Sequence, residues 1–204
     1  MFIAWKLGAE TDAITDMARA NGGTVTSSMV DRAGISRAAL KQLADAGGLV
    51  RAGRGVYVLP DSLEDELLTW QHRYRRGVYS HATALFLHGL TDRTPDRFHM
   101  TFPQGYNTSR VDGSAVAAHT ASGGLYELGL STARTPAGHE VAAYNPERAL
   151  CDVLRPRARC DRSIAAEAFK RYARSPGRDV PLLSEYAKRL SVEPKVRSYL
   201  EVLL

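Results

Sequence analysis

The stretch from Val25 to Leu59 decides the fold of the N-terminal part of the chain. It reads VTSSMVDRAGISRAALKQL and continues as ADAGGLVRAGRGVYVL. Two short helical patterns lie on either side of Gly34, and two short strand patterns follow around the turn Gly53-Arg54-Gly55. Helix, turn, helix and basic hairpin is the order of a winged helix-turn-helix, a module that reads DNA.

Capping residues and apolar spacing define the helices of this module. A first helix is expected over residues 12–21, and Thr26 or Ser27 can cap a second one, since a hydroxyl accepts an orphan backbone N–H. The expected buried face of the second helix is Val25, Met29, Val30 and Ala33. Ser36 is expected to cap a third helix, whose inward stripe is Ala39, Leu40 and Leu43. Residues 49–51 and 56–58 are the expected strands of the hairpin.

The rest of the chain mixes helical and strand patterns. A connecting helix is expected from Leu63, with Leu67, Trp70 and Tyr74 at helical spacing and with Glu64, Asp65 and Glu66 solvated. Ser80 can cap the next helix, which ends at Gly89. Strands are expected at residues 98–102, 115–119 and 140–144, and helices at 145–154, 163–173, 181–190 and 194–204. The predicted fold class is α+β: a winged helix-turn-helix (1–60), a connecting helix (61–76) and a mixed α/β domain with a C-terminal helical portion (77–204).

Composition narrows the class of protein. The chain of 204 residues has a net charge of +5, and its basic residues are concentrated from Arg155 onward, where there are twelve Lys or Arg and six Asp or Glu. Such a balance favours a polyanionic partner. The two cysteines form no CxxC pair, no apolar run reaches membrane-span length and no signal peptide is recognised. We therefore expect a cytoplasmic protein without a membrane partner.

Three segments together resemble a known family. These are the block LVRAGRGVY at residues 49–57, the segment YSHATAL at 79–85 that leads to HGL at 88–90, and the helix PERALCD at 146–152. In this order and spacing they resemble the AbiEi-type antitoxins of the abortive-infection AbiE toxin–antitoxin systems, which are type IV-like. The resemblance implies an N-terminal winged helix that represses its own operon. It also implies a C-terminal domain that neutralises a nucleotidyltransferase-like toxin.

Residues for DNA contact follow from the module. Arg37 and Lys41 lie four apart on the outward face of the third helix and suit guanine edges or phosphates, and Ser36 suits a phosphate. Arg51 and Arg54 on the hairpin can reach the backbone or the minor groove. The alternative for all of them is a solvated charged surface. The expected DNA-binding set is Ser27, Ser36, Arg37, Lys41, Arg51 and Arg54.

Outside the module, candidate sites are fewer. Arg155, Arg157, Arg159 and Arg162 are candidates for contact with the toxin or with nucleic acid, against a solvated face as the alternative. His81 and His88 can share a helix face, but no Cys or carboxylate stands at ligand spacing, so a polar core role is favoured and no metal site is expected. Arg148 and Asp152, four apart, are interpreted as a structural ion pair.

Three functional hypotheses remain open. The first is an antitoxin that neutralises its toxin by contact and autorepresses its operon as a dimer or cooperative assembly on operator DNA. No P-loop, HExxH or GxSxG motif is present, so no catalytic residue and no cofactor is assigned. The second is enzymatic neutralisation by an atypical serine/threonine protein kinase that phosphorylates the toxin. The third is a plain winged-helix transcriptional regulator.

Overall fold

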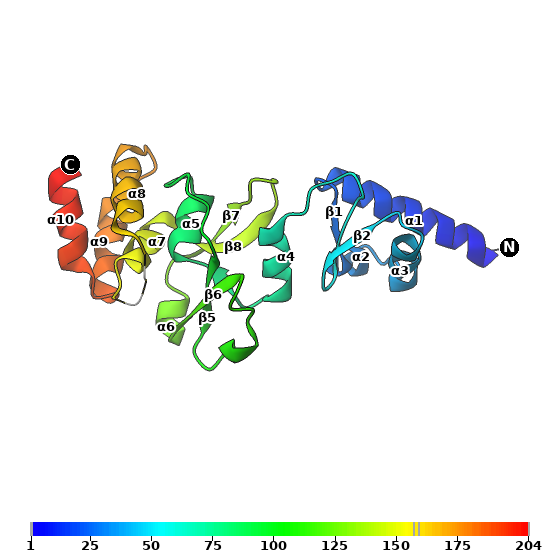
Figure 1. Ribbon diagram of the computed structural model, residues 1–204, viewed down its shortest axis with the longest axis horizontal. Coiled ribbons are helices and arrows are strands. Elements are labelled where there is room, and N and C mark those ends of the chain that lie inside the picture. The colour runs from blue at the N-terminus through cyan, green and yellow to red at the C-terminus, as the bar shows by residue number, and fades with distance from the viewer. Residues whose placement is uncertain (1, 157, 159, 204) are drawn as a thin grey trace. The chain divides into compact units, whose positions relative to one another are not determined.

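The computed structural model describes residues 2–156, 158 and 160–203, with residues 2–7 traced by their backbone. The chain is a mixed α+β protein, as predicted, and it divides into two compact units (Figure 1). Unit 1 comprises the residues up to Arg75 together with the segment Thr135–His139. Unit 2 comprises Arg76–Arg134 and Glu140–Leu204.

Unit 1 combines four helices with a small antiparallel sheet. The elements are α1 (Phe2–Ala20), β1 (Thr24–Thr26), α2 (Ser27–Arg32), α3 (Arg37–Asp45), β2 (Val50–Gly53), β3 (Val56–Val58) and α4 (Glu66–Arg73). The strand order is β1-β3-β2, and β3 pairs with both neighbours. Its apolar core gathers Ile14 and Ala18 of α1, Val25 of β1, Val30 of α2 and Leu40 of α3.

Hydroxyl side chains cap α2 and α3. The Thr26 side chain accepts the backbone N–H of Met29, so Thr26 rather than the alternative Ser27 caps α2. The Ser36 side chain accepts the backbone N–H of Ala39, which confirms the cap predicted for α3. Gly34 separates the two helices with φ of +68°, a left-handed conformation that is open to glycine at little cost. Local sequence therefore sets where each of these helices begins and where the chain turns between them.

Several predictions for unit 1 are wrong in detail. The first helix begins at Phe2 rather than near residue 12, and Val25 lies in strand β1, which the sequence reading missed. Ala33 is exposed, and the Leu63 side chain is 92% exposed, because the fourth helix begins only at Glu66.

Asp65 is buried rather than solvated. Its carboxylate caps α4 through Leu68 N and accepts a hydrogen bond from the Thr135 hydroxyl. His139 Nδ1 lies 2.7 Å from the same carboxylate. These partners explain why an acidic side chain is tolerated inside unit 1.

Unit 2 is built on a five-stranded mixed sheet in the order β6-β5-β4-β8-β7. The strands are β4 (Val78–Tyr79), β5 (Phe98–Pro103), β6 (Val116–Ala121), β7 (Leu130–Arg134) and β8 (Glu140–Tyr144). β4 runs parallel to β8 and antiparallel to β5, and β5 runs parallel to β6. The sequence analysis missed β4 and β7 and placed the other strands to within two residues.

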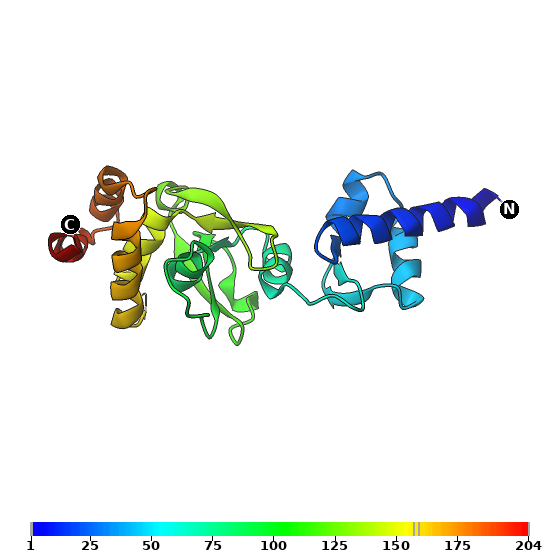
Figure 2. The same ribbon diagram turned by 90° about the horizontal axis from the view of Figure 1, so that it is seen from above.

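Helices α5 (His81–Leu87), α7 (Pro146–Val153), α8 (Arg162–Arg174), α9 (Val180–Arg189) and α10 (Glu193–Leu203) form the main core of unit 2. A 3-10 turn (Thr108–Arg110) and α6 (Gly123–Tyr126) complete this unit. Figures 1 and 2 show α8, α9 and α10, coloured orange to red, packed together beside α7. Leu85, Leu150, Phe169 and Leu183 are central members of this core. The predicted helical C-terminal portion is therefore confirmed.

Candidate nucleic-acid interface

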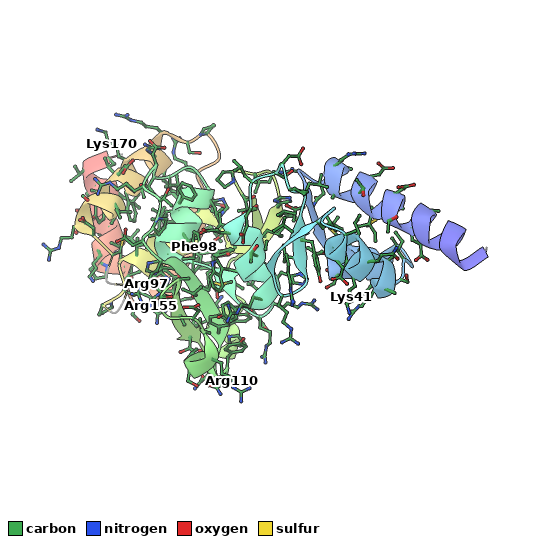
Figure 3. All side chains as sticks on the ribbon, turned by 45° about the vertical axis from the view of Figure 1, so that its right-hand side comes forward. Lys41, Arg97, Phe98, Arg110, Arg155 and Lys170 are labelled. Atoms are coloured by element: carbon green, nitrogen blue, oxygen red, sulfur yellow. The ribbon has the colours of Figure 1, made fainter. Side chains whose placement is uncertain are left out.

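The outward face of α3 is the main candidate surface. Arg37, Ala38, Lys41, Gln42 and Asp45 are exposed, whereas Ala39 and Leu40 on the opposite face are buried. Lys41 makes no hydrogen bond or ion pair with the part of the chain that the structure describes, and Figure 3 shows its side chain reaching away from the helix. An exposed helix face of this kind has the size that the DNA major groove admits.

Arg37 is placed on this face but already has a partner. Its guanidinium donates two hydrogen bonds to the Asp31 carboxylate of α2, with Nε 2.8 Å from Oδ1 and Nη2 2.6 Å from Oδ2. These hydrogen bonds raise the pKa of Arg37 and lower the pKa of Asp31. Because the pair is exposed, the guanidinium is oriented at the surface and remains accessible to another anion.

The two serines of the predicted DNA-binding set make contacts within unit 1. The Ser36 hydroxyl donates to Glu10 Oε2 at 2.5 Å while it accepts the N–H of Ala39, so its proton is already used inside unit 1. Ser27 is half-buried at the first position of α2, and its backbone N–H donates to Gly55 O at 2.9 Å. The start of α2 and the hairpin turn are therefore neighbours.

The β2–β3 turn is held closely against other parts of unit 1. Gly55 has φ of +74°, and a Cβ there would lie 2.7 Å from Ser27 Oγ and 2.8 Å from His72 Nε2. A Cβ at Gly53 would lie 2.7 Å from Thr69 Cγ2 of α4. These close contacts hold the backbone on both sides of Arg54, whose side chain is exposed at the tip of the turn. Arg51 Nε donates to Gly53 O within the same hairpin.

The sequence analysis missed one polar residue on α3. Gln42 is exposed directly beside Lys41, and a glutamine amide can pair with adenine in the major groove. The sequence pattern could have identified Gln42, because it follows Lys41 on the same outward face. The predicted DNA-binding set contains only the cationic residues of that face.

The four C-terminal arginines belong to unit 2, and the structure places two of them. Arg155 is half-buried, with Nη1 3.8 Å from Asp152 Oδ1, and Arg162 is exposed at the start of α8. Arg157 and Arg159 lie outside the described residues. Their joint role as a contact surface for toxin or nucleic acid therefore stays a prediction.

His81 and His88 do not share a site, because each has different partners. His88 Nε2 lies 2.8 Å from the backbone oxygen of Tyr144, which is the polar core role expected for it. His81 is buried and meets two other imidazoles instead, those of His99 and His119.

The predicted Arg148–Asp152 ion pair is confirmed. Arg148 Nε lies 3.0 Å from Asp152 Oδ2, and both side chains are fully buried. Arg148 also donates to the backbone oxygens of Leu125 and Leu128, and its guanidinium lies 4.3 Å from the centre of the Tyr144 ring. The pair is therefore part of the packing of unit 2.

Comparisons with known proteins bear on both units. Residues 12–60 match the sequence model of the AbiEi antitoxin family of transcriptional regulators, which confirms for this segment the resemblance drawn from the sequence. No curated protein sequence matches the chain. The crystal structure of the Rv2827c protein from Mycobacterium tuberculosis is similar, with a TM-score of 0.53 and 17% sequence identity over 93% of this chain and 79% of that one. At that identity the likeness concerns the fold.

Within the described residues, no helix is both long enough and apolar enough to span a membrane.

Proposed function

We propose that unit 1 is a winged helix-turn-helix that binds operator DNA, with α3 as the recognition helix and the β2–β3 hairpin as the wing. One observation carries the proposal most directly: α3 exposes Lys41 and Gln42 beside one another, and the braced wing presents Arg54. These residues all fall within the segment that matches a family of antitoxin transcriptional regulators.

Each element has a defined part in this proposal. Gln42 and Arg37 supply hydrogen bonds to base edges, Lys41 and Arg54 neutralise phosphates, and Arg51 stabilises the hairpin. Residues 1–60 carry seven Lys or Arg against five Asp or Glu, so one copy has a modest charge for holding a polyanion. Two copies on an inverted repeat would supply the affinity that a repressor needs.

The test is fluorescence anisotropy with the promoter DNA of the chain's own operon across a range of salt concentrations. Lys41→Ala and Arg54→Ala should each weaken binding on all sequences and reduce the salt slope by about one, because each removes one phosphate contact. Gln42→Ala should instead reduce the preference for operator over random DNA.

Lys170→Ala provides a matched control. Lys170 is exposed on α8 in unit 2 and is labelled with Lys41 in Figure 3, and its loss removes the same charge. If Lys170→Ala lowers affinity as much as Lys41→Ala, net charge rather than the α3 surface determines binding. The assignment of the recognition helix would then be rejected.

We further propose that the protein is the antitoxin of a cytoplasmic toxin–antitoxin pair, with unit 2 neutralising a nucleotidyltransferase-like toxin. The family match of unit 1 and the basic excess of the C-terminal region, which suits an acidic surface, support this proposal. Full-length protein carrying both Lys41→Ala and Arg54→Ala should still rescue cells that express the neighbouring toxin gene. Failure of the wild-type chain to rescue growth would leave a plain DNA-binding regulator.

A further inference from the structure

Three imidazoles from distant parts of the sequence meet in unit 2. His81 begins α5, His99 lies in β5 and His119 lies in β6. One nitrogen of each ring lies within 4.8 Å of the chosen nitrogens of the other two. We refer to these three residues as the histidine trio.

The rings are arranged in two different ways. His99 Nδ1 and His119 Nε2 are 3.0 Å apart, while the ring centroids are 5.2 Å apart and the planes differ by 11°. These values describe two nearly coplanar rings that meet edge to edge through their nitrogens. The His81 ring lies face to face with the His119 ring, with centroids 3.8 Å apart.

The surrounding structure holds the trio in position. His81 has φ of +51°, a conformation that is uncommon for residues other than glycine. Its Nδ1 lies 2.9 Å from Ser80 Oγ, which also accepts a hydrogen bond from the Thr101 hydroxyl. The backbone N–H of His99 donates to Thr83 Oγ1 at 2.8 Å. Strand, turn and helix are thus tied together around the three rings.

Burial lowers the pKa of each imidazole of the trio. Burial, with a contribution from the charge of Arg97, lowers the pKa of His99 to about 4. Burial, then His99 and Arg155, lowers the pKa of His119 to about 4, and burial lowers the pKa of His81 well below its usual value. Neutral imidazole is the form that binds metals, since its second nitrogen carries a free lone pair.

We propose that His81, His99 and His119 form a binding site for a divalent first-row transition ion such as Zn²⁺. Imidazole is a ligand that suits Zn, Cu, Fe and Ni, whereas Mg and Ca prefer oxygen. In the tautomer in which His81 Nδ1 donates to Ser80 Oγ, His81 Nε2 is left for the metal, which is the usual division of roles in a histidine ligand. This inference is independent of the function proposed for unit 1.

Metal binding requires the three rings to reorient. Zinc–nitrogen bonds of about 2.0–2.1 Å in a tetrahedral site put the nitrogens about 3.3 Å apart. The His99–His119 contact of 3.0 Å therefore has to open by a few tenths of an ångström, and the proton between the two nitrogens has to move to the other nitrogen of its ring. The His81 ring has to turn about its side-chain torsions, because stacked rings cannot direct their in-plane lone pairs at one point.

Two arginines influence which fourth ligand the ion would bind. Arg97 and Arg155 both lower the pKa of His119 through their charge, and Figure 3 labels them on unit 2. Their charge opposes a bare cation and favours an anion beside it. Three protein ligands leave a fourth position for water or such an anion.

The test uses untagged full-length protein stripped with a chelator and then titrated with Co²⁺ and Zn²⁺. The wild type should bind one ion per chain, with visible absorption from Co²⁺ that Zn²⁺ displaces and a Zn²⁺ dissociation constant of about 1 μM or lower. His119→Gln and His99→Gln should each weaken binding about 100-fold or more, beyond the effect of changing a residue that only orients a ligand.

Matched variants separate ligation from packing. His72→Gln, at a half-buried histidine of unit 1, should bind Zn²⁺ as the wild type does. Ser80→Ala keeps all three imidazoles but removes the partner of His81 Nδ1, so it should weaken binding about 10- to 100-fold. Circular dichroism melting confirms that each variant is folded. A wild-type chain that binds no ion, or trio variants that bind like His72→Gln, would overturn the proposal and leave a packed cluster of histidines.

Discussion

Two Arg–Asp ion pairs, one taken from each unit, differ in burial and in what they do for the fold. In unit 1, Arg37 and Asp31 join two neighbouring helices at the surface, six residues apart in sequence. In unit 2, Arg148 and Asp152 lie four apart on α7 and are fully buried. The exposed pair can exchange its partners for water, whereas the side chains of the buried pair are shielded from solvent. The same two residue types therefore support surface recognition in one unit and packing in the other.

Burial also changes the pKa of the aspartate in the buried pair. Desolvation raises the pKa of Asp152 against the opposing influence of Arg148, while the hydrogen bond from Arg37 lowers the pKa of Asp31. Nη2 of Arg148 and Oδ1 of Asp152 form no hydrogen bond within the described residues. Such a pair is costly to break and gives little net stability compared with apolar side chains of the same volume.

The largest expected effect is that of Arg148→Ala. The substitution removes the hydrogen-bonded partner of the buried Asp152, so unit 2 should lose about 3–5 kcal/mol of its free energy of unfolding. Hydrogen exchange of the α7 amides measures this loss in unit 2. Tryptophan fluorescence monitors unit 1, because both tryptophans, residues 5 and 70, lie there. Unchanged protection of α7 would show that the buried pair has no structural role.

Removing both buried charges should cost less. In the double variant Arg148→Met with Asp152→Leu, no uncompensated charge remains, so we expect at least half of the stability lost in Arg148→Ala to return. The same exchange measurement applies. A double variant as unstable as Arg148→Ala would indicate that the hydrogen bonds to Leu125 O and Leu128 O, rather than the ion pair, stabilise this part of unit 2.

The exposed pair should matter for DNA affinity rather than for folding. Arg37→Ala removes a cation from the proposed recognition surface and should weaken operator binding several-fold. Asp31→Ala removes an anion and releases the guanidinium, so it should strengthen binding or leave it unchanged. Anisotropy measurements at low salt compare the two. If both substitutions weaken binding equally, the pair acts only by positioning α2 against α3.

The smallest expected effect is on the stability of unit 1. Arg37→Ala should leave the urea midpoint reported by tryptophan fluorescence within error of the wild-type value, since exposed ion pairs contribute little. Any difference seen at low salt should vanish at about 1 M salt, where exposed charges are screened. A loss that persists at high salt would mean that the pair is better shielded than its exposure indicates.

Local signals explain which parts of the fold were predictable. Ser36, Thr26 and Gly34 act on the few residues next to them, so the boundaries of α2 and α3 followed from the sequence. The strands β1 and β4, of three and two residues, are too short to show alternation. They exist because partners far along the chain supply their hydrogen bonds.

The candidate sites likewise differ in whether a local sequence pattern predicts them. Lys41 and Arg54 could be found from a helix face and a turn, each a local pattern. The histidine trio could not, because His99 and His119 lie on separate strands at no recognised ligand spacing from His81. Asp65 was misjudged for a similar reason, since its two side-chain partners stand 70 and 74 residues further along.

Those partners of Asp65 have a consequence for synthesis. Residues up to Arg75 leave the ribosome well before Thr135 and His139 are made, so the nascent unit 1 has its α4 cap but lacks two partners of that carboxylate. Domains generally fold as they emerge, N-terminal first. Here the first unit reaches its final form only after about two thirds of the chain has been translated. A ribosome stalled before residue 135 should therefore hold a unit 1 that is more readily cleaved by protease around α4 than the released protein is.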